Sequence, residues 1–370
     1  MREYLLVLLV AAATTYLLAG LCRQLAIRWG VLARVRNRDM HTIPKPYFGG
    51  LAMLGGLAVS LILAIQMPFL SRFATVGHDA LAVLAASGLI CLVGLLDDMF
   101  ELNALVKFGG QVLAAGAAVL GGVRIYWIPL PNAVVTIDDA SSILITVLFI
   151  AVCANAVNFV DGLDGLAAGV VAIGAGAFFA YSYVLAYEQN LVRATTASLI
   201  TVATVGICLG FLAHNFQPAR MFMGDAGAML LGFLMAMSAI SFTGQVDPSA
   251  LSRDHDDVLP ALLPILLPLV TLALPLMDLA LAYARRTARG QHPFVADKQH
   301  LHHRMIARGH SQRAAVLILC SWSAIVAGGL VCVLLLNHSA TWWTLAICTV
   351  ALAIVTLLPP GRRSKGTTGG

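Results

Sequence analysis

Eleven stretches of the 370-residue chain are apolar and long enough, or nearly long enough, to cross a membrane as helices. A membrane-spanning helix needs about 20 predominantly apolar residues, with a range of roughly 17–25. The candidate spans are 5–21, 48–67, 81–96, 105–123, 141–157, 166–186, 195–213, 228–242, 258–282, 314–336 and 340–358. Spans 141–157 and 228–242 are at or below the short limit, so their ends are the least well defined.

Composition agrees with a polytopic membrane protein. Hydrophobic residues make up 59% of the chain and charged residues 11%, with a mean hydropathy of +0.87, whereas a soluble domain has about 25% charged residues. Helices are expected because backbone groups in lipid must be hydrogen-bonded within the segment, and the alternation of a membrane barrel is absent. The sequence predicts an all-α protein with about eleven transmembrane helices in a single domain, 1–358. A short hairpin is predicted near 124–137 and a disordered tail over 359–370.

The positive charges are distributed unevenly between the two sides of this arrangement. With the N-terminus outside, 18 of the 23 Lys and Arg residues fall on inside segments and 5 on outside segments. The positive-inside rule therefore predicts an outside N-terminus and a cytoplasmic C-terminus. The cationic inner face could attract anionic lipid headgroups or steer an anionic substrate. No nucleic-acid partner is expected, because neither a basic-aromatic surface nor a known binding motif is present.

Four polar clusters interrupt the apolar pattern, and all four fall on the predicted cytoplasmic side. They are Asp97-Asp98, the segment 158–165, Gly224-Asp225 and the segment 300–303. Polar groups at a membrane boundary are costly unless they bind something. The sequence therefore predicts a functional site at this boundary.

The second cluster is rich in oxygen ligands. Its polar residues recur every third position, which would place them on one helix face, while Gly162 and Gly165 predict that the helix ends there. These residues are Asn155, Asn158, Asp161 and Asp164. Such oxygens suit a hard cation such as Mg²⁺, which binds one or two protein oxygens together with substrate phosphates. Alternatively, Asp161 or Asp164 caps the helix that begins at 166.

The remaining acids permit both a functional and a structural interpretation. Asp97 and Asp98 are adjacent and would point about 100° apart on a helix, so one could act while the other orients a neighbour. They could also simply mark the helix end in solvent. Asp225 could cap the eighth span, but as the third acid on one side it is a candidate metal ligand.

The basic residues on the same side suit anionic ligands. The loop containing His300, His302, His303 and Arg304 can bind phosphate oxygens. A zinc site is the alternative, although cysteines and the i,i+4 histidine spacing are missing. Lys107 could contact a phosphate or extend to the interface. Lys45, between two prolines, lies in a turn that could close on substrate or only lead into the second span.

In this order, the motifs resemble those of the polyprenyl-phosphate N-acetylhexosamine-1-phosphate transferase family. The matching pieces are His41 with Pro44-Lys45-Pro46 and Gly49-Gly50, Leu96-Asp97-Asp98, Lys107 with Gln111, Asn155 with the segment 158–167, Phe222 to Gly227, and Asp297 to Arg304. Leu301 separates His300 from His302-His303, and this His-x-His-His-Arg form resembles the branch that uses UDP-GlcNAc. The branch that uses UDP-MurNAc-pentapeptide usually carries three consecutive histidines.

The resemblance implies transfer of GlcNAc-1-phosphate from UDP-GlcNAc to a polyprenyl phosphate at the cytoplasmic face of a bacterial plasma membrane, initiating a cell-envelope polysaccharide. It implies Mg²⁺, with Mn²⁺ as an alternative, held by Asp225 and Asn158. The implied catalytic residues are Asp97, Asp98, Asp225 and Lys107, and the implied substrate-binding residues are Lys45, Asn155, Asp161, Asp164, His300, His302, His303 and Arg304. In this assignment Asp97 or Asp98 acts on the lipid phosphate.

Several alternatives remain open at this stage. The donor could be UDP-GalNAc or UDP-MurNAc-pentapeptide, and transfer could be direct or pass through a covalent aspartyl-phosphate at Asp225. An ion-coupled transporter is the rival from another class, but it should place its acids near the bilayer midplane. The expected partners are UDP-GlcNAc, polyprenyl phosphate and the bilayer. The oligomeric state is undetermined, a homodimer being one option.

Overall fold

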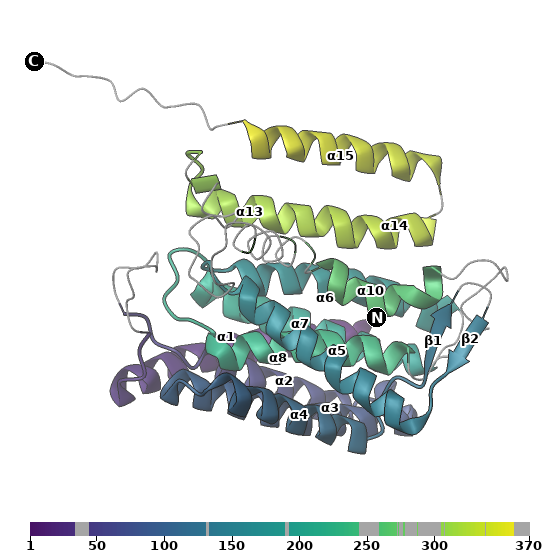
Figure 1. The fold of residues 1–370 in the computed structure, drawn as a ribbon, viewed down its shortest axis with the longest axis horizontal. Coiled ribbons are helices and arrows are strands. Elements are labelled where there is room, and N and C mark those ends of the chain that lie inside the picture. Colours follow the sequence, from purple (N-terminus) through teal and green to yellow (C-terminus); the bar gives the residue numbers. More distant parts are fainter. Residues whose placement is uncertain are drawn as a thin grey trace, which may run out of the picture.

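The structure, a computed structural model, is a bundle of long helices with one small hairpin (Figure 1). It describes residues 1–33, 44–130, 133–188, 192–243, 259–271, 305–306, 308–336 and 338–358, together with 273, 277 and 287. The helices are α1 (Arg2–Trp29), α2 (Gly49–Ala64), α3 (Ala74–Phe100), α4 (Ala104–Leu120), α5 (Asp139–Val160), α6 (Leu166–Glu188), α7 (Val192–Asn215), α8 (Gly224–Thr243), α10 (Leu259–Thr271), α13 (Gln312–Ser323), α14 (Gly329–Leu336) and α15 (Ser339–Leu357). A 3₁₀ turn, η1, covers Leu70–Arg72, and a π-helical segment, η2 (Ala324–Gly328), joins α13 to α14.

The prediction of an all-α polytopic membrane protein is confirmed. Eight helices are long and apolar enough to cross a membrane, and three shorter apolar helices occur at Gly49–Ala64, Ala104–Leu120 and Leu262–Thr271. Together they match the eleven predicted spans, although the ninth is described only as far as Thr271, apart from isolated residues. The two spans that appeared too short are in fact α5, with 22 residues, and α8, with 20. The hydropathy pattern had excluded their end turns, which contain Asp139 and Asn158 in α5 and the segment 224–227 in α8.

Helix α8 lies at the centre of the bundle. Every one of its residues except Asp225 is buried, which is why it is apolar on all sides rather than along one stripe. Small residues let its neighbours approach closely: a Cβ on Gly232 would lie 2.3 Å from the carbonyl oxygen of Cys153 on α5. The middle of α8 is therefore held in close contact with α5.

The predicted hairpin is present, as strands β1 (Trp127–Leu130) and β2 (Ala133–Thr136). The strands pair antiparallel, with Trp127 opposite Thr136 and Leu130 opposite Ala133. The segment leading into β1 is fixed to α5, because Ile125 N–H donates to Thr146 Oγ1 at 3.0 Å and Ser142 Oγ donates to the Ile125 carbonyl at 2.6 Å. The hairpin lies at the right-hand end of the bundle in Figure 1.

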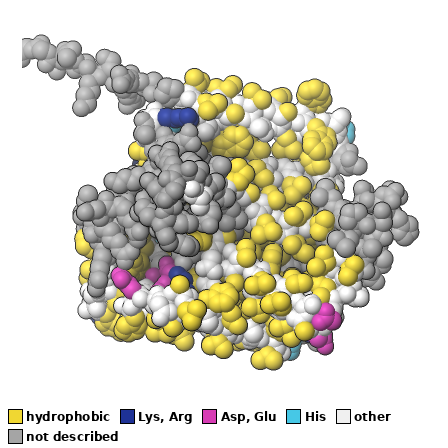
Figure 2. All heavy atoms as spheres, in the orientation of Figure 1, with side chains coloured by type: hydrophobic (Ala, Val, Ile, Leu, Met, Phe, Trp, Pro, Cys, Tyr) yellow, Lys and Arg dark blue, Asp and Glu magenta, His cyan; other side chains and the backbone are white. Residues whose placement is uncertain are grey.

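The outer surface of the bundle is largely apolar. Figure 2 shows hydrophobic side chains across the middle of the visible face, with acidic and basic side chains side by side near its lower left. Helix α15 has no buried residue, and Trp342 and Trp343 are 62% and 73% exposed. An apolar surface of this extent is expected on a protein surrounded by lipid, so the chain is a multi-pass membrane protein.

Candidate functional site

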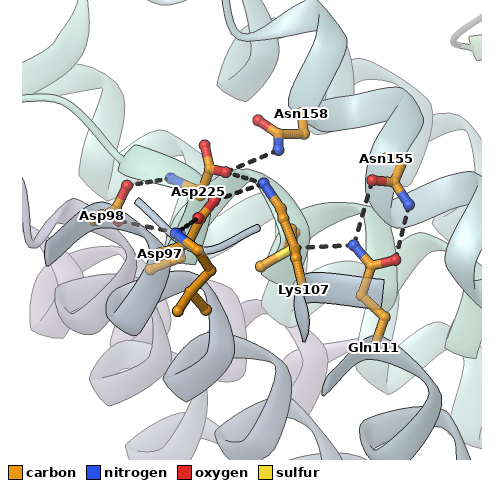
Figure 3. Close-up of polar contacts among 10 residues, drawn as sticks. Asp97, Asp98, Lys107, Gln111, Asn155, Asn158 and Asp225 are labelled. Atoms are coloured by element: carbon orange, nitrogen blue, oxygen red, sulfur yellow. Dashed lines mark hydrogen bonds and ion pairs between the residues drawn. The ribbon is translucent and has the colours of Figure 1, made fainter. Parts of the chain in front are cut away.

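The predicted polar clusters that the structure describes meet at one end of the bundle. Antiparallel neighbours place the end of α3 beside the start of α4, and the ends of α5 and α7 beside the starts of α6 and α8. The residues that meet there are Asp97 and Asp98 from α3, Lys107 and Gln111 from α4, Asn155 and Asn158 from α5, and Asp225 from α8 (Figure 3). Chain segments more than a hundred residues apart therefore form a single site.

Lys107 connects the acids of two helices. Its ammonium donates to Asp97 Oδ2 at 2.8 Å and also to Asp225 Oδ2. Asn158 Nδ2 donates to the same Asp225 oxygen at 3.1 Å. The other oxygen of Asp97 accepts from Leu102 N–H at 2.8 Å, so Asp97 is fixed on both sides. One positive charge between two carboxylates offsets the repulsion that they would otherwise exert on each other.

Asp98 makes a different set of contacts from its neighbour. Its two carboxylate oxygens accept from the backbone N–H groups of Asp225, at 2.8 Å, and Ala226, at 3.2 Å. These are N–H groups of the first turn of α8, which have no partner within the helix. The capping role that the sequence allows for Asp225 is thus filled by Asp98 from α3, and the Asp225 side chain points toward Lys107 and Asn158.

An amide pair lies one helical turn deeper. Asn155 Nδ2 donates to Gln111 Oε1 at 2.8 Å, and Gln111 Nε2 donates back to Asn155 Oδ1 at 3.3 Å. Gln111 Nε2 also lies 3.2 Å from Met229 Sδ on α8. This pair fixes α4 against α5 below Lys107 and Asn158. Asn155 therefore lies beside the site, with its side chain engaged by Gln111.

The turn between α5 and α6 forms a second part of the site. Helix α5 ends at Val160 and Gly165 has a φ of +82°, so the helix breaks where the glycines predicted. Asp164 accepts from Lys45 Nζ at 2.9 and 3.2 Å and from Ala219 N–H at 2.9 Å. The Lys45 ammonium also lies 4.8 Å from the centre of the Phe222 ring. Two residues for which the sequence predicted substrate contacts, Lys45 and Asp164, thus form one ion pair.

Asp161 lies in the same turn, directly after α5. Burial, with a smaller contribution from the nearby Asp225 and Asp164 carboxylates, raises the pKa of Asp161 to about 7. A carboxyl group with this pKa is protonated in a substantial fraction of molecules at neutral pH. It can then donate a hydrogen bond, which an ordinary aspartate cannot.

Sequence reasoning missed two of the residues that shape this second part, Asn215 and Ala219, and named Phe222 only as part of a motif. Asn215 Oδ1 accepts from Gly165 N–H at 2.9 Å, and Asn215 Nδ2 donates to the Met221 carbonyl at 3.0 Å. Ala219 and Phe222 contact Asp164 and Lys45, as described above. The polar Asn215 at the end of an apolar span was a usable signal, whereas a backbone donor such as Ala219 leaves no trace in the sequence.

The donor atoms fit the predicted Mg²⁺ site. The Asp225 carboxylate and the Asn158 amide are in contact, and carboxylate and amide oxygens are the ligands that Mg²⁺ prefers. A half-turn of the Asn158 amide would present its oxygen. Among the described residues, no group of three or more His, Cys, Asp or Glu could hold a metal ion.

One predicted cluster cannot be placed. His300, His302, His303 and Arg304 lie outside the residues that the structure describes, as does His41. Both the phosphate-binding and the zinc interpretation of the histidine loop therefore stay predictions. The tail 359–370 is outside the described residues as well.

The chain is similar to known membrane transferases. The model of glycosyl transferase family 4 matches residues 80–243, which include every labelled residue of Figure 3. Decaprenyl-phosphate N-acetylglucosaminephosphotransferase of Mycolicibacterium smegmatis is 41% identical over 367 residues, covering 98% of this chain and 90% of the relative. A probable undecaprenyl-phosphate N-acetylglucosaminyl 1-phosphate transferase of Bacillus subtilis is 29% identical, covering 95% and 89%. Phospho-N-acetylmuramoyl-pentapeptide-transferase of Mycobacterium ulcerans is 30% identical, covering 64% of this chain and 75% of the relative.

Proposed function

The chain belongs to glycosyl transferase family 4, together with the polyprenyl-phosphate N-acetylglucosamine-1-phosphate transferases, and from this premise we propose that it transfers GlcNAc-1-phosphate from UDP-GlcNAc to a polyprenyl phosphate. The products are polyprenyl-diphospho-GlcNAc and UMP. The observation that carries the proposal is the cluster of Lys107, Asp97, Asn158 and Asp225 at one end of an apolar bundle.

The position of the cluster suits two substrates of opposite solubility. A polyprenyl tail stays in the bilayer while a sugar nucleotide stays in water, so their phosphates can meet only at a membrane boundary. The cluster is formed by the ends of α3 and α5 and the starts of α4 and α8. We place it at the cytoplasmic face of a bacterial plasma membrane, because of the unequal distribution of Lys and Arg and because nucleotide sugars are cytoplasmic.

The reaction joins two anions, so its barrier contains charge repulsion that the protein must offset. A Mg²⁺ bound by Asp225 and Asn158 would supply positive charge to the pyrophosphate of the donor. Lys107 lies in hydrogen-bond contact with both Asp97 and Asp225, where its ammonium can also bind a phosphate oxygen. Asp97, fixed by Leu102 N–H and Lys107, then orients the lipid phosphate by accepting a hydrogen bond from its P–OH group. An unprotonated oxygen of the same phosphate attacks the β-phosphorus and displaces UMP.

The second part of the site is assigned to the nucleotide and the sugar. Lys45 is held between Asp164 and the Phe222 ring and can exchange its carboxylate partner for a ligand oxygen. Asp161, whose pKa is raised to about 7 by burial, can donate a hydrogen bond to the nucleotide while it is protonated. The loop 300–304 is assigned to the sugar phosphate on its sequence alone.

Among donor sugars, GlcNAc is favoured by the extent of the similarity. The GlcNAc transferase relative matches 98% of this chain, whereas the muramoyl-pentapeptide transferase relative matches 64%. UDP-GalNAc and UDP-MurNAc-pentapeptide remain the alternative donors. An ion-coupled transporter is disfavoured because the described acids gather at helix ends rather than at mid-bundle.

The deciding experiment is a transfer assay with radiolabelled UDP-GlcNAc, UDP-GalNAc and UDP-MurNAc-pentapeptide in parallel, each with polyprenyl phosphate and Mg²⁺ in detergent. We expect a lipid-extractable labelled product from UDP-GlcNAc, with release of UMP. Label in the lipid fraction from another donor alone would reassign the substrate. No lipid-linked product from any of the three donors would overturn the proposed reaction.

A further inference from the structure

In the contacts described above, Asp98 accepts hydrogen bonds only from backbone N–H groups, whereas the neighbouring Asp97 accepts one from Lys107. Its two oxygens accept from the N–H groups of Asp225 and Ala226, at 2.8 and 3.2 Å. A carboxylate at this position satisfies two orphan donors of α8 and interacts favourably with the positive end of the helix dipole. The cap is supplied by another helix, 127 residues earlier in the chain.

The fit between Asp98 and the start of α8 is close. Gly224, the first residue of α8, has a φ of +69°, a conformation that favours glycine. A Cβ at this position would lie 2.2 Å from Asp98 Oδ2. One turn earlier on α3, a Cβ on Gly94 would lie 2.4 Å from the Cα of Ala226. Two points on α3 thus hold the turn that carries Asp225.

We infer that Asp98 is a positioning residue for the divalent cation site: it fixes the backbone of Asp225 so that the Asp225 carboxylate meets Asn158, and it does not bind the lipid phosphate. To reach a substrate, the Asp98 oxygens would have to leave two N–H groups at the start of a buried helix, at the cost of their hydrogen bonds. The inference rests on the proposed function only in taking the cation to be Mg²⁺ or Mn²⁺.

The first test measures Mn²⁺ binding to the purified protein in detergent by electron paramagnetic resonance, without substrates. Mn²⁺ stands in for Mg²⁺ because it accepts the same oxygen ligands. In Asp98→Asn, the amide can accept one N–H group through its oxygen but turns its own NH₂ toward the other. We expect Mn²⁺ affinity to fall about 10- to 100-fold, as for other groups that orient metal ligands. Unchanged affinity would overturn the inference.

The matched control is Asp138→Asn. Asp138 also caps a helix, accepting from Ser141 N–H at 3.1 Å, but it does so at the start of α5, at the opposite end of the bundle. The same chemical change at this cap should leave Mn²⁺ affinity at the wild-type value. An equal loss in both variants would show a general effect of weakened caps, which also contradicts the inference.

A second variant leaves Asp98 in place. In Gly224→Ala the new methyl group would displace the Asp98 carboxylate, so we expect a comparable loss of Mn²⁺ affinity. The double variant, with both Asp98→Asn and Gly224→Ala, should lose little more Mn²⁺ affinity than the single variant with the larger loss, because both changes break the same contact. Additive losses would show that the two residues act separately and would overturn the inference.

Kinetics separate positioning from lipid binding. In Asp98→Asn, the Mg²⁺ concentration that gives half-maximal rate should rise about 10-fold or more, while the KM for polyprenyl phosphate stays near the wild-type value. A raised KM for the lipid with an unchanged Mg²⁺ requirement would assign Asp98 to the lipid instead. If the wild-type protein bound Mn²⁺ but transferred no sugar phosphate, the proposed function would fail while the binding comparison still decided the role of Asp98.

Discussion

At the scale of single residues, the site depends on contacts between charges that come from different helices. Lys107 is bonded to Asp97 and Asp225, and Asn158 is bonded to the same oxygen of Asp225. Removing Lys107 would leave the partly buried Asp97 and Asp225 carboxylates without their cation, which costs more than the loss of an exposed ion pair. The residues of this cluster should therefore tolerate little substitution.

Asp225→Asn tests the proposed cation ligand. The amide keeps the size of the side chain but removes the charge that attracts Mg²⁺, so transfer should fall at least about 100-fold. The measurement is the rate of label transfer from UDP-GlcNAc to lipid at saturating Mg²⁺, with folding checked by gel filtration. Asp139→Asn is the control, because Asp139 pairs with Arg124 and its side chain is 83% exposed. Turnover near the wild-type rate in Asp225→Asn would contradict the assignment.

The pKa of Asp161 predicts a pH dependence of stability. Burial raises this pKa from 3.8 to about 7, so the folded protein binds the proton more tightly than the unfolded chain. The stabilisation is complete below about pH 4 and is lost as pH rises toward 7. In Asp161→Asn, the side chain is neutral at every pH. The decrease in melting temperature between pH 5 and pH 8 should therefore be a few degrees smaller in the variant than in the wild type.

Asp138→Asn is the control for this comparison. Hydrogen bonds with Ser141 lower the pKa of Asp138. Any stability that the ionised Asp138 contributes is therefore lost only at a pH below the usual pKa of an aspartate, which is outside the window from pH 5 to pH 8. Its decrease in melting temperature should match that of the wild type. An Asp161→Asn variant with an unchanged decrease would show that the proton on Asp161 does not contribute.

At the scale of helices, the position of the catalytic side chains depends on close approach. Gly49 and Gly50 start α2 against the start of α8: their N–H groups donate to the carbonyls of Phe222 and Met223 at 3.2 and 2.9 Å. A Cβ on Gly50 would lie 2.3 Å from the Gly227 nitrogen. Glycines at these places permit backbone contact between helices.

Two glycines on α3 allow a matched test. A Cβ on Gly94 would lie 2.4 Å from the Cα of Ala226, whereas a Cβ on Gly88 would have nothing within 4 Å. Gly94→Ala should lower the melting temperature by several degrees and reduce transfer at least about 10-fold, because α3 and α8 must separate. Gly88→Ala should be neutral or stabilising, since alanine favours the helix. Equal behaviour of the two variants would refute the role of close packing.

The sequence predicted most helices but only part of the site. Apolar runs locate the spans, and the motifs locate Asp97, Asn158 and Asp225, because both signals are local. It could not choose between Asp97 and Asp98, since their difference depends on where α8 begins in space. The predicted spans for α5 and α8 were also too short, because an apolar run ends where polar or glycine residues begin, whereas tertiary contacts keep those end turns helical. Contacts to backbone, such as that of Asp164 with Ala219 N–H, depend on the fold and leave no residue pattern.

At the scale of the whole molecule, the two ends of the bundle differ in charge and chemistry. The polar cluster lies at one end, and the hairpin β1–β2 lies at the other. Arg2 and Arg72 lie with the hairpin at the end away from the cluster, because α1 and α3 each run from that end toward the site. The predicted orientation would place both arginines outside. This separation is what a transferase with one aqueous substrate needs, and the orientation in the membrane decides which compartment supplies that substrate.

Cysteine labelling tests the orientation. Arg308 and Thr136 are both exposed, at the site end and on the hairpin respectively. In a background without the seven native cysteines, Thr136→Cys should react with an impermeant thiol reagent in intact cells, whereas Arg308→Cys should react only after the cells are opened. The predicted cytoplasmic site requires this result, since UDP-GlcNAc is supplied in the cytosol and a positive inner face fixes topology. If the reagent labelled Arg308→Cys in intact cells, the bundle would have the opposite orientation, and the site could not take its nucleotide substrate from the cytosol.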